Sequence, residues 1–296
     1  MDVRAVVATS MDPQTSALCM AQHLEMAGRS NVEVIVGEDI HGLGVGIWKD
    51  DALVGFPLRE KCLDELFTES DDDLDAIMST LGSLDDLAEM MDDSERNDWV
   101  YISLGGMTSL ATLTKEYPEA TGKIEDLIVM AANICSDLEI YPFVRAPAQE
   151  TNAAADPEAA NFIFSQDGPG KNFYIMPVDP GQGTIEGEHY EQIIEAAESD
   201  DCPGATALID FYSEWNKQAR ADETILTHFE AIEYDPKVSS ALRYDPTCVL
   251  YAAQLLTQGE EKDDFVTTEI IPGIWFDDDA YTYIEEGFEL AARNVW

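Results

Sequence analysis

The chain alternates short runs of apolar, mostly β-branched residues with longer segments in which apolar residues recur every three or four positions. A short apolar run is typical of a buried strand, and the longer spacing is typical of an amphipathic helix. The runs that predict strands are residues 3–9, 32–36, 99–105, 126–131 and 172–178. The segments between them that predict helices are residues 14–27, 107–117 and 156–165.

This order of elements predicts the fold class. Alternation of strand and helix indicates an α/β protein with a mostly parallel, open, Rossmann-related sheet and helices on both faces. The acidic region 58–97 predicts helices packed on the outside. After residue 187 the pattern is mainly helical, including 245–256, before a late strand at 267–276 and a closing helix at 279–296. No repeat or linker divides the chain, so we expect a single domain over residues 1–296.

The charge is the unusual feature of the composition. The chain has 60 acidic residues against 16 basic residues, a formal net charge of -44, while 45% of its residues are hydrophobic. Such self-repulsion opposes a compact state at low salt, and molar salt screens it because the Debye length falls to about 3 Å. Acidic residues distributed along a whole globular chain are typical of proteins from halophilic organisms that keep salt inside, or from their viruses.

The same composition argues against several classes of protein. Nucleic-acid binding needs clustered lysine and arginine, and the sequence has no such cluster. The acidic runs at 69–75, 90–95 and 276–280 lack the spacing and central glycine of an EF-hand. The four histidines do not have metal-ligand spacing; they are His23, His41, His189 and His228.

The cysteines and the first ten residues give expectations about the cellular location of the protein. Five scattered cysteines without a CxxC pair predict free, mostly buried thiols in a reducing compartment. The opening "MDVRAVVATS" does not have the features of a signal peptide, and no apolar run reaches membrane-spanning length. We therefore expect a protein without a membrane span, cytoplasmic in a high-salt cell or part of a virus particle.

The stretch "QETNAAADPEAA" (149–160) combines a helix start with two unexplained polar residues. Asp156 and Pro157 suit the cap and the first position of a helix. Glu150 and Asn152 are predicted to lie in a loop after a parallel strand, where ligands bind in open sheets. By similar reasoning, Thr108 or Ser109 could cap the helix after the "LGG" turn, and Asp245 could cap the helix that follows it.

Four segments, taken in order, resemble the inosine-uridine-type nucleoside hydrolases. Residues 100–132 resemble that family's strand, "LGPLTNLA" turn, helix and "VxMGG" strand. Residues 146–164 are similar to its "AAEFNxxxDPEAAxxVF" segment, residues 173–179 to its "xTMVPLD" strand, and residues 244–252 to its "HDPLAxA" segment. Four matches in correct order and spacing are far more specific than any one, and they imply the family's α/β fold.

The resemblance implies a pocket that binds ribose around a calcium ion. In the family, a carboxylate and an amide of the "EFN" segment hold the sugar hydroxyls, and Glu150 and Asn152 match these positions. The aspartate of "HDP" is a calcium ligand in the family, and Asp245 matches it.

Other matching positions depart from the family pattern. Thr151 replaces an aromatic residue, Tyr244 replaces the histidine associated with the leaving group, and Ala131 and Ala132 replace the paired glycines. The family also opens with a strand that ends in "DxDPGxDDxxAL", which supplies most of the calcium-binding carboxylates and the base that activates the attacking water.

The opening of this chain allows two interpretations. In the first, residues 6–39 match the family's second unit without a gap, Ser10 stands where the family has asparagine, and the whole first strand is missing. In the second, residues 6–18 are an altered first strand in which Asp12 survives. We favour the first because its match has no gap. Both interpretations leave too few carboxylates in the opening segment to bind calcium, which takes about 6–8 oxygen ligands.

The sequence therefore predicts a catalytically degenerate relative of the nucleoside hydrolases that serves as a structural, assembly or binding subunit. We expect no cofactor, or calcium if the site is retained, and we expect self-association or a larger protein assembly, with nucleoside or ribose as the candidate ligand. The alternative is an active calcium-dependent nucleoside N-ribohydrolase that recruits other acidic residues, such as Asp39, as ligands.

Overall fold

The computed structural model describes residues 2–10, 12–40, 77–94, 97–131, 151–165, 168–176, 194–196 and 244–258. Within these ranges the strands coincide with the five apolar runs near the amino-terminal and central parts of the chain. They are β1 (Ala5–Ser10), β2 (Glu33–Asp39), β3 (Trp99–Ser103), β4 (Ile124–Met130) and β5 (Asn172–Met176). The prediction of these strands is confirmed, with ends that differ by at most a few residues.

Helices separate the strands, as the apolar spacing predicts. They are α1 (Pro13–Met26), α4 (Leu84–Asp93), α5 (Thr108–Glu116), α6 (Pro118–Thr121), α7 (Thr151–Ala155), α8 (Pro157–Phe164) and α12 (Tyr244–Gln258). The start of α8 forms as expected: Asp156 accepts a hydrogen bond from the Ala159 amide at 3.0 Å, and Pro157 is the first helical residue. The described residues thus have the α/β architecture.

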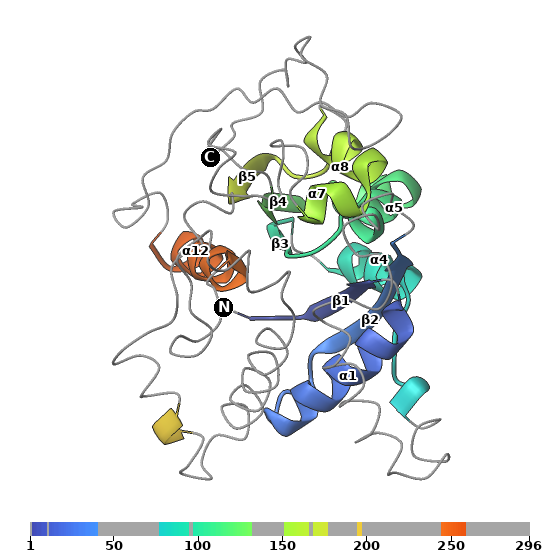
Figure 1. The fold of residues 1–296 in the computed structure, drawn as a ribbon. Coiled ribbons are helices and arrows are strands. Elements are labelled where there is room, and N and C mark those ends of the chain that lie inside the picture. The colour runs from blue at the N-terminus through green and yellow to red at the C-terminus, as the bar shows by residue number, and fades with distance from the viewer. Residues whose placement is uncertain are drawn as a thin grey trace, which may run out of the picture.

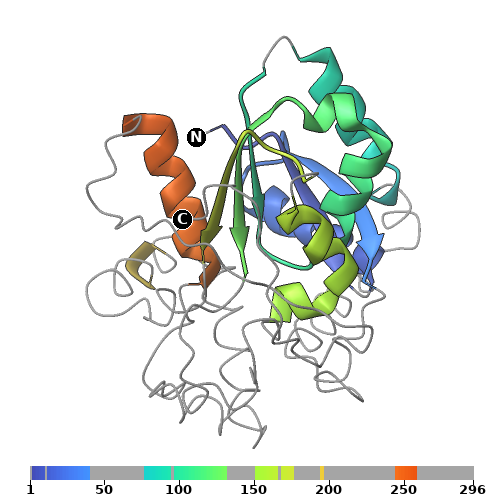
Figure 2. The same cartoon turned by 90° about the horizontal axis from the view of Figure 1, so that it is seen from above.

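All strand pairs in the described part of the chain are parallel. β1 pairs with β2 in one sheet, and β3, β4 and β5 pair in that order in a second sheet. The strands of both sheets are seen side by side, with helices around them, in Figure 2. Since parallel strands end at a common edge, their carboxyl ends gather at one side of the molecule.

Helices cover both faces, so that alternate residues of a strand enter different cores (Figure 1). Leu127 and Val129 of β4 face α4, α5 and α8, whereas Ile128 and Met130 face α12. All four are buried, and burial of each such side chain contributes about 1.5–3 kcal/mol. Helix α1 packs on β1 and β2 through Ala17, which contacts the same small core as Ala8 and Val34.

Three sequence-based expectations about helix positions are wrong. Asn152 does not lie in a loop: the "TNAAA" segment forms the short helix α7, because alanine has the highest helix propensity. Asp245 lies in the first turn of α12 instead of before it. Neither Thr108 nor Ser109 caps α5, whose N-cap residue is Met107 without a side-chain cap bond.

Other expectations are met in part or lie outside the described residues. Helix α4 confirms the helical prediction for one part of 58–97, with its acidic side exposed and Leu84, Leu87, Ala88 and Met91 buried. The late strand 267–276 and the closing helix 279–296 lie outside the described residues.

The cysteines correct a further expectation. Cys248 is free and buried, as predicted. Cys19 is disulfide-bonded, so the prediction of free thiols throughout is wrong. Sequence spacing does not reveal which cysteines meet in space, and the absence of a CxxC pair therefore did not exclude this bond.

Among the described helices, none is both long and apolar enough to span a membrane. This agrees with the absence of a long apolar run in the sequence.

Candidate functional site

The side chain of Asn152 lies at the carboxyl ends of β3 and β4. Its Nδ2 donates to the carbonyl oxygen of Leu104 at 3.2 Å and to that of Met130 at 3.0 Å. Because both carbonyls only accept hydrogen bonds, the amide nitrogen must face them, and Oδ1 is directed away from the strand ends. The amide group of Asn152 thus links the carboxyl ends of β3 and β4.

Ser109 makes the corresponding link for β1 and β2. Its Oγ lies 2.6 Å from Thr9 Oγ1 and accepts a hydrogen bond from the Glu38 amide at 2.8 Å. The side chain is 1% exposed. A Cβ atom at Gly37 would lie 2.4 Å from this oxygen, so glycine is required there for the close approach of α5.

Thr108 connects the first turn of α5 to the start of α8. Its hydroxyl donates to Asp156 Oδ2 at 2.8 Å, while Asp156 Oδ1 accepts from the amide of Ala159. Both carboxylate oxygens of Asp156 are therefore used to join two helices. Neither this link nor that of Ser109 was predicted from the sequence, although hydroxyl residues directly after a strand-to-helix glycine turn were a usable signal.

Asp12, the candidate survivor of the family's acidic cluster, has a structural role. It is the N-cap of α1, and its two oxygens accept from the Thr15 amide at 3.1 Å and from the Thr15 hydroxyl at 2.9 Å. An aspartate cap of this kind stabilises a helix by about 0.5–2 kcal/mol. This role explains the residue without a metal.

Asp245 lies on the other side of the sheet from α5 and α8, in the first turn of α12. That helix packs through Cys248 and Tyr251 against Tyr174 and other residues of β4 and β5. Asp245 keeps a solvent-exposed surface, yet desolvation by the surrounding protein raises its pKa to about 6. Burial raises the pKa of the neighbouring Cys248 thiol to about 12, with a smaller contribution from the charge of Asp245.

The remaining predicted positions are distributed along the same edge and beyond it. Ser10 ends β1 and pairs in register with Asp39 at the end of β2. Ala131 follows β4, is buried, and donates its amide to the carbonyl of Met176 at 3.2 Å. Thr151 begins α7 and Tyr244 begins α12. Glu150 and Ala132 lie outside the described residues.

Among the described residues, those that match the family do not fit the calcium ion that the resemblance implies. Calcium takes about 6–8 oxygen ligands. Within the described ranges no group of three or more histidine, cysteine, aspartate or glutamate side chains could hold a metal ion. Asp12 and Asp156 cap helices, and Asn152 turns its nitrogen toward the strand ends.

Comparisons with known proteins agree with the fold. The family model described as "Inosine-uridine preferring nucleoside hydrolase" matches residues 3–273. A comparison with curated protein sequences finds no match.

Several solved structures are similar to the chain. The effector protein XOO4466 is 16% identical with a TM-score of 0.55, covering 90% of this chain and 75% of that chain. The type III effector protein XopQ, complexed with adenosine diphosphate ribose, is 17% identical with a TM-score of 0.53, covering 84% and 71%. The purine-preferring ribonucleoside hydrolase from Gardnerella vaginalis is 15% identical with a TM-score of 0.51, covering 92% and 75%.

Proposed function

The chain belongs to the inosine-uridine preferring nucleoside hydrolase family, and on this premise we propose that it is a non-catalytic member that acts as a binding or structural subunit. The observation that carries the proposal is the use of Asp12. Hydrolysis in this family needs several carboxylates that hold calcium and deprotonate a water. Here the one aspartate of the opening segment that could belong to such a cluster holds Thr15 and caps α1.

The surroundings of Asp245 support the same proposal. Within the described ranges Asp245 does not belong to a group of three or more metal-binding side chains, so it is a weak candidate ligand.

Asn152 supports a residual binding role more than a catalytic one. Its nitrogen is held by the carbonyls of Leu104 and Met130, which fixes the orientation of the amide. A fixed amide oxygen can accept a hydrogen bond from a sugar hydroxyl without any metal. The net charge of -44 further supports a setting of high salt concentration.

The alternative is an active nucleoside N-ribohydrolase, and one feature favours it. Glu38 and Asp39 lie at the end of β2, beside the end of β1, where replacement carboxylates would have to be. Glu150, outside the described residues, would be a further contributor.

A hydrolysis assay separates the two functions. The full chain is incubated with inosine or uridine and calcium chloride in about 2 M KCl, which screens the chain's charge. Free base is measured by chromatography and free ribose by a reducing-sugar assay. We expect no release above the buffer rate. Base and ribose released in equal amounts, at a rate that falls in Asp39→Asn or Asp245→Asn but not in Glu89→Gln, would establish the enzyme instead.

Calorimetric titration then separates a binding role from a purely structural one. Ribose, inosine and adenosine diphosphate ribose are the ligands to test, the last because the similar XopQ structure is a complex with it. Heat that saturates and is lost in Asn152→Ala would support binding at the strand ends. Sedimentation velocity on the same samples would measure self-association, and a monomer without ligand heat would argue against both forms of the proposal.

A further inference from the structure

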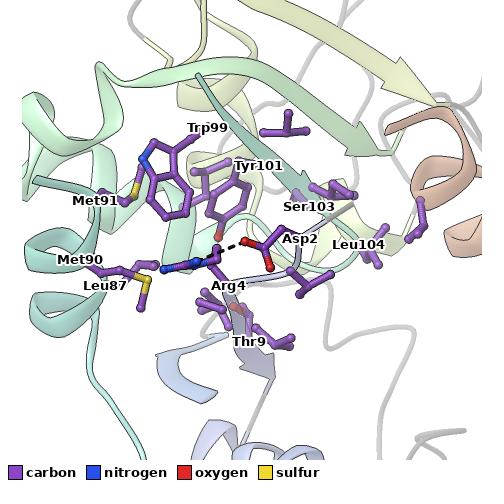
Figure 3. A pocket seen from close by; sticks show the side chains of 18 of the residues that line it. Asp2, Arg4, Thr9, Leu87, Met90, Met91, Trp99, Tyr101, Ser103 and Leu104 are labelled. Carbon is purple, nitrogen blue, oxygen red and sulfur yellow. Dashed lines mark hydrogen bonds and ion pairs between the residues drawn. The ribbon is translucent and has the colours of Figure 1, made fainter. Parts of the chain in front are cut away.

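We draw no further inference here: the strongest candidate, the cavity of about 920 Å³ that β1 and β3 line between the two sheets (Figure 3), carries nothing, because nothing in the described part of the chain shows what occupies it.

Discussion

Ser109 Oγ and Thr9 Oγ1 lie 2.6 Å apart, although 100 positions separate these residues in the chain. This contact, with the bond from the Glu38 amide to the same serine oxygen, connects α5 to both strands of the amino-terminal sheet. β1 and β3 are not paired in the described residues, and Ser109 joins the first sheet to the helix that follows β3.

Replacement of Ser109 by alanine should therefore lower the free energy of unfolding by about 1–3 kcal/mol, because Thr9 and the Glu38 amide lose a buried partner. Urea unfolding followed by circular dichroism measures the change. Thr112→Ala is the matched control on the same helix, at a half-buried position, and should change stability by less than about 0.5 kcal/mol. Equal effects of the two substitutions would contradict the structural role of Ser109.

Lys123 provides the second prediction, because its ammonium group caps the carboxyl end of α4. Nζ donates to the carbonyl oxygens of Met91 at 2.9 Å, Asp92 at 2.7 Å and Ser94 at 3.3 Å. Lys123→Met keeps the apolar stem but removes the donor. It should lower the free energy of unfolding by about 1–2 kcal/mol, since carbonyls at a helix end lose a cation.

Lys115→Met is the control for Lys123→Met, because both raise the net negative charge by one. Lys115 is half exposed and lies 4.0 Å from Glu158. An exposed pair of this kind contributes about 0–1 kcal/mol. If Lys115→Met destabilised the protein as much as Lys123→Met, overall charge and not the helix cap would be responsible.

The contacts of Lys123 and Asn152 illustrate what the sequence could not reveal. Apolar periodicity is local, so it predicted the strands, α1, α5 and α8, and the cap at Asp156 is readable because all its residues are adjacent. Lys123 meets residues about 30 positions away, which no local pattern records. Asn152 was predicted as a ligand in a loop, whereas tertiary packing directs its nitrogen into the ends of two strands.

The sequence also did not predict that the described strands form two separate sheets. One interpretation of the opening segment removed a strand, but the sequence did not show whether β1 would close onto β3 or leave a gap. In the structure they leave a gap, which Leu87 and Met91 of α4 line on one side and Val249 and Leu256 of α12 on the other.

Asp245 carries the third prediction, which concerns pH. Its pKa is raised from an unfolded value of about 3.9 to about 6, chiefly by desolvation. A carboxyl group with a raised folded pKa favours the folded state most below the unfolded pKa, and this contribution is lost as pH rises through about 6. The Asp245→Asn variant should therefore gain stability relative to the unaltered chain as pH rises from about 4 to about 6.

The difference between the two proteins isolates Asp245 from the many other acidic groups. Urea midpoints of both are measured at intervals over this pH range in the same salt. Glu89→Gln, which removes an exposed carboxylate of α4, serves as the control. A stability difference for Asp245→Asn that stays constant with pH would contradict the raised pKa.

The fourth prediction follows from the net charge of -44. Raising KCl from about 0.1 M to about 2 M shortens the Debye length from about 10 Å to below about 3 Å, so repulsion among surface carboxylates should fall and the urea midpoint should rise. The triple variant Glu89→Gln, Glu116→Gln, Glu119→Gln removes three exposed carboxylates and should need less salt to reach the same midpoint.

Sodium chloride should act like potassium chloride, because screening depends on ionic strength, whereas sucrose should not reproduce the difference between the triple variant and the unaltered chain. A urea midpoint that is independent of salt, or a triple variant with the same salt dependence as the unaltered chain, would show that charge repulsion does not limit the stability of this fold.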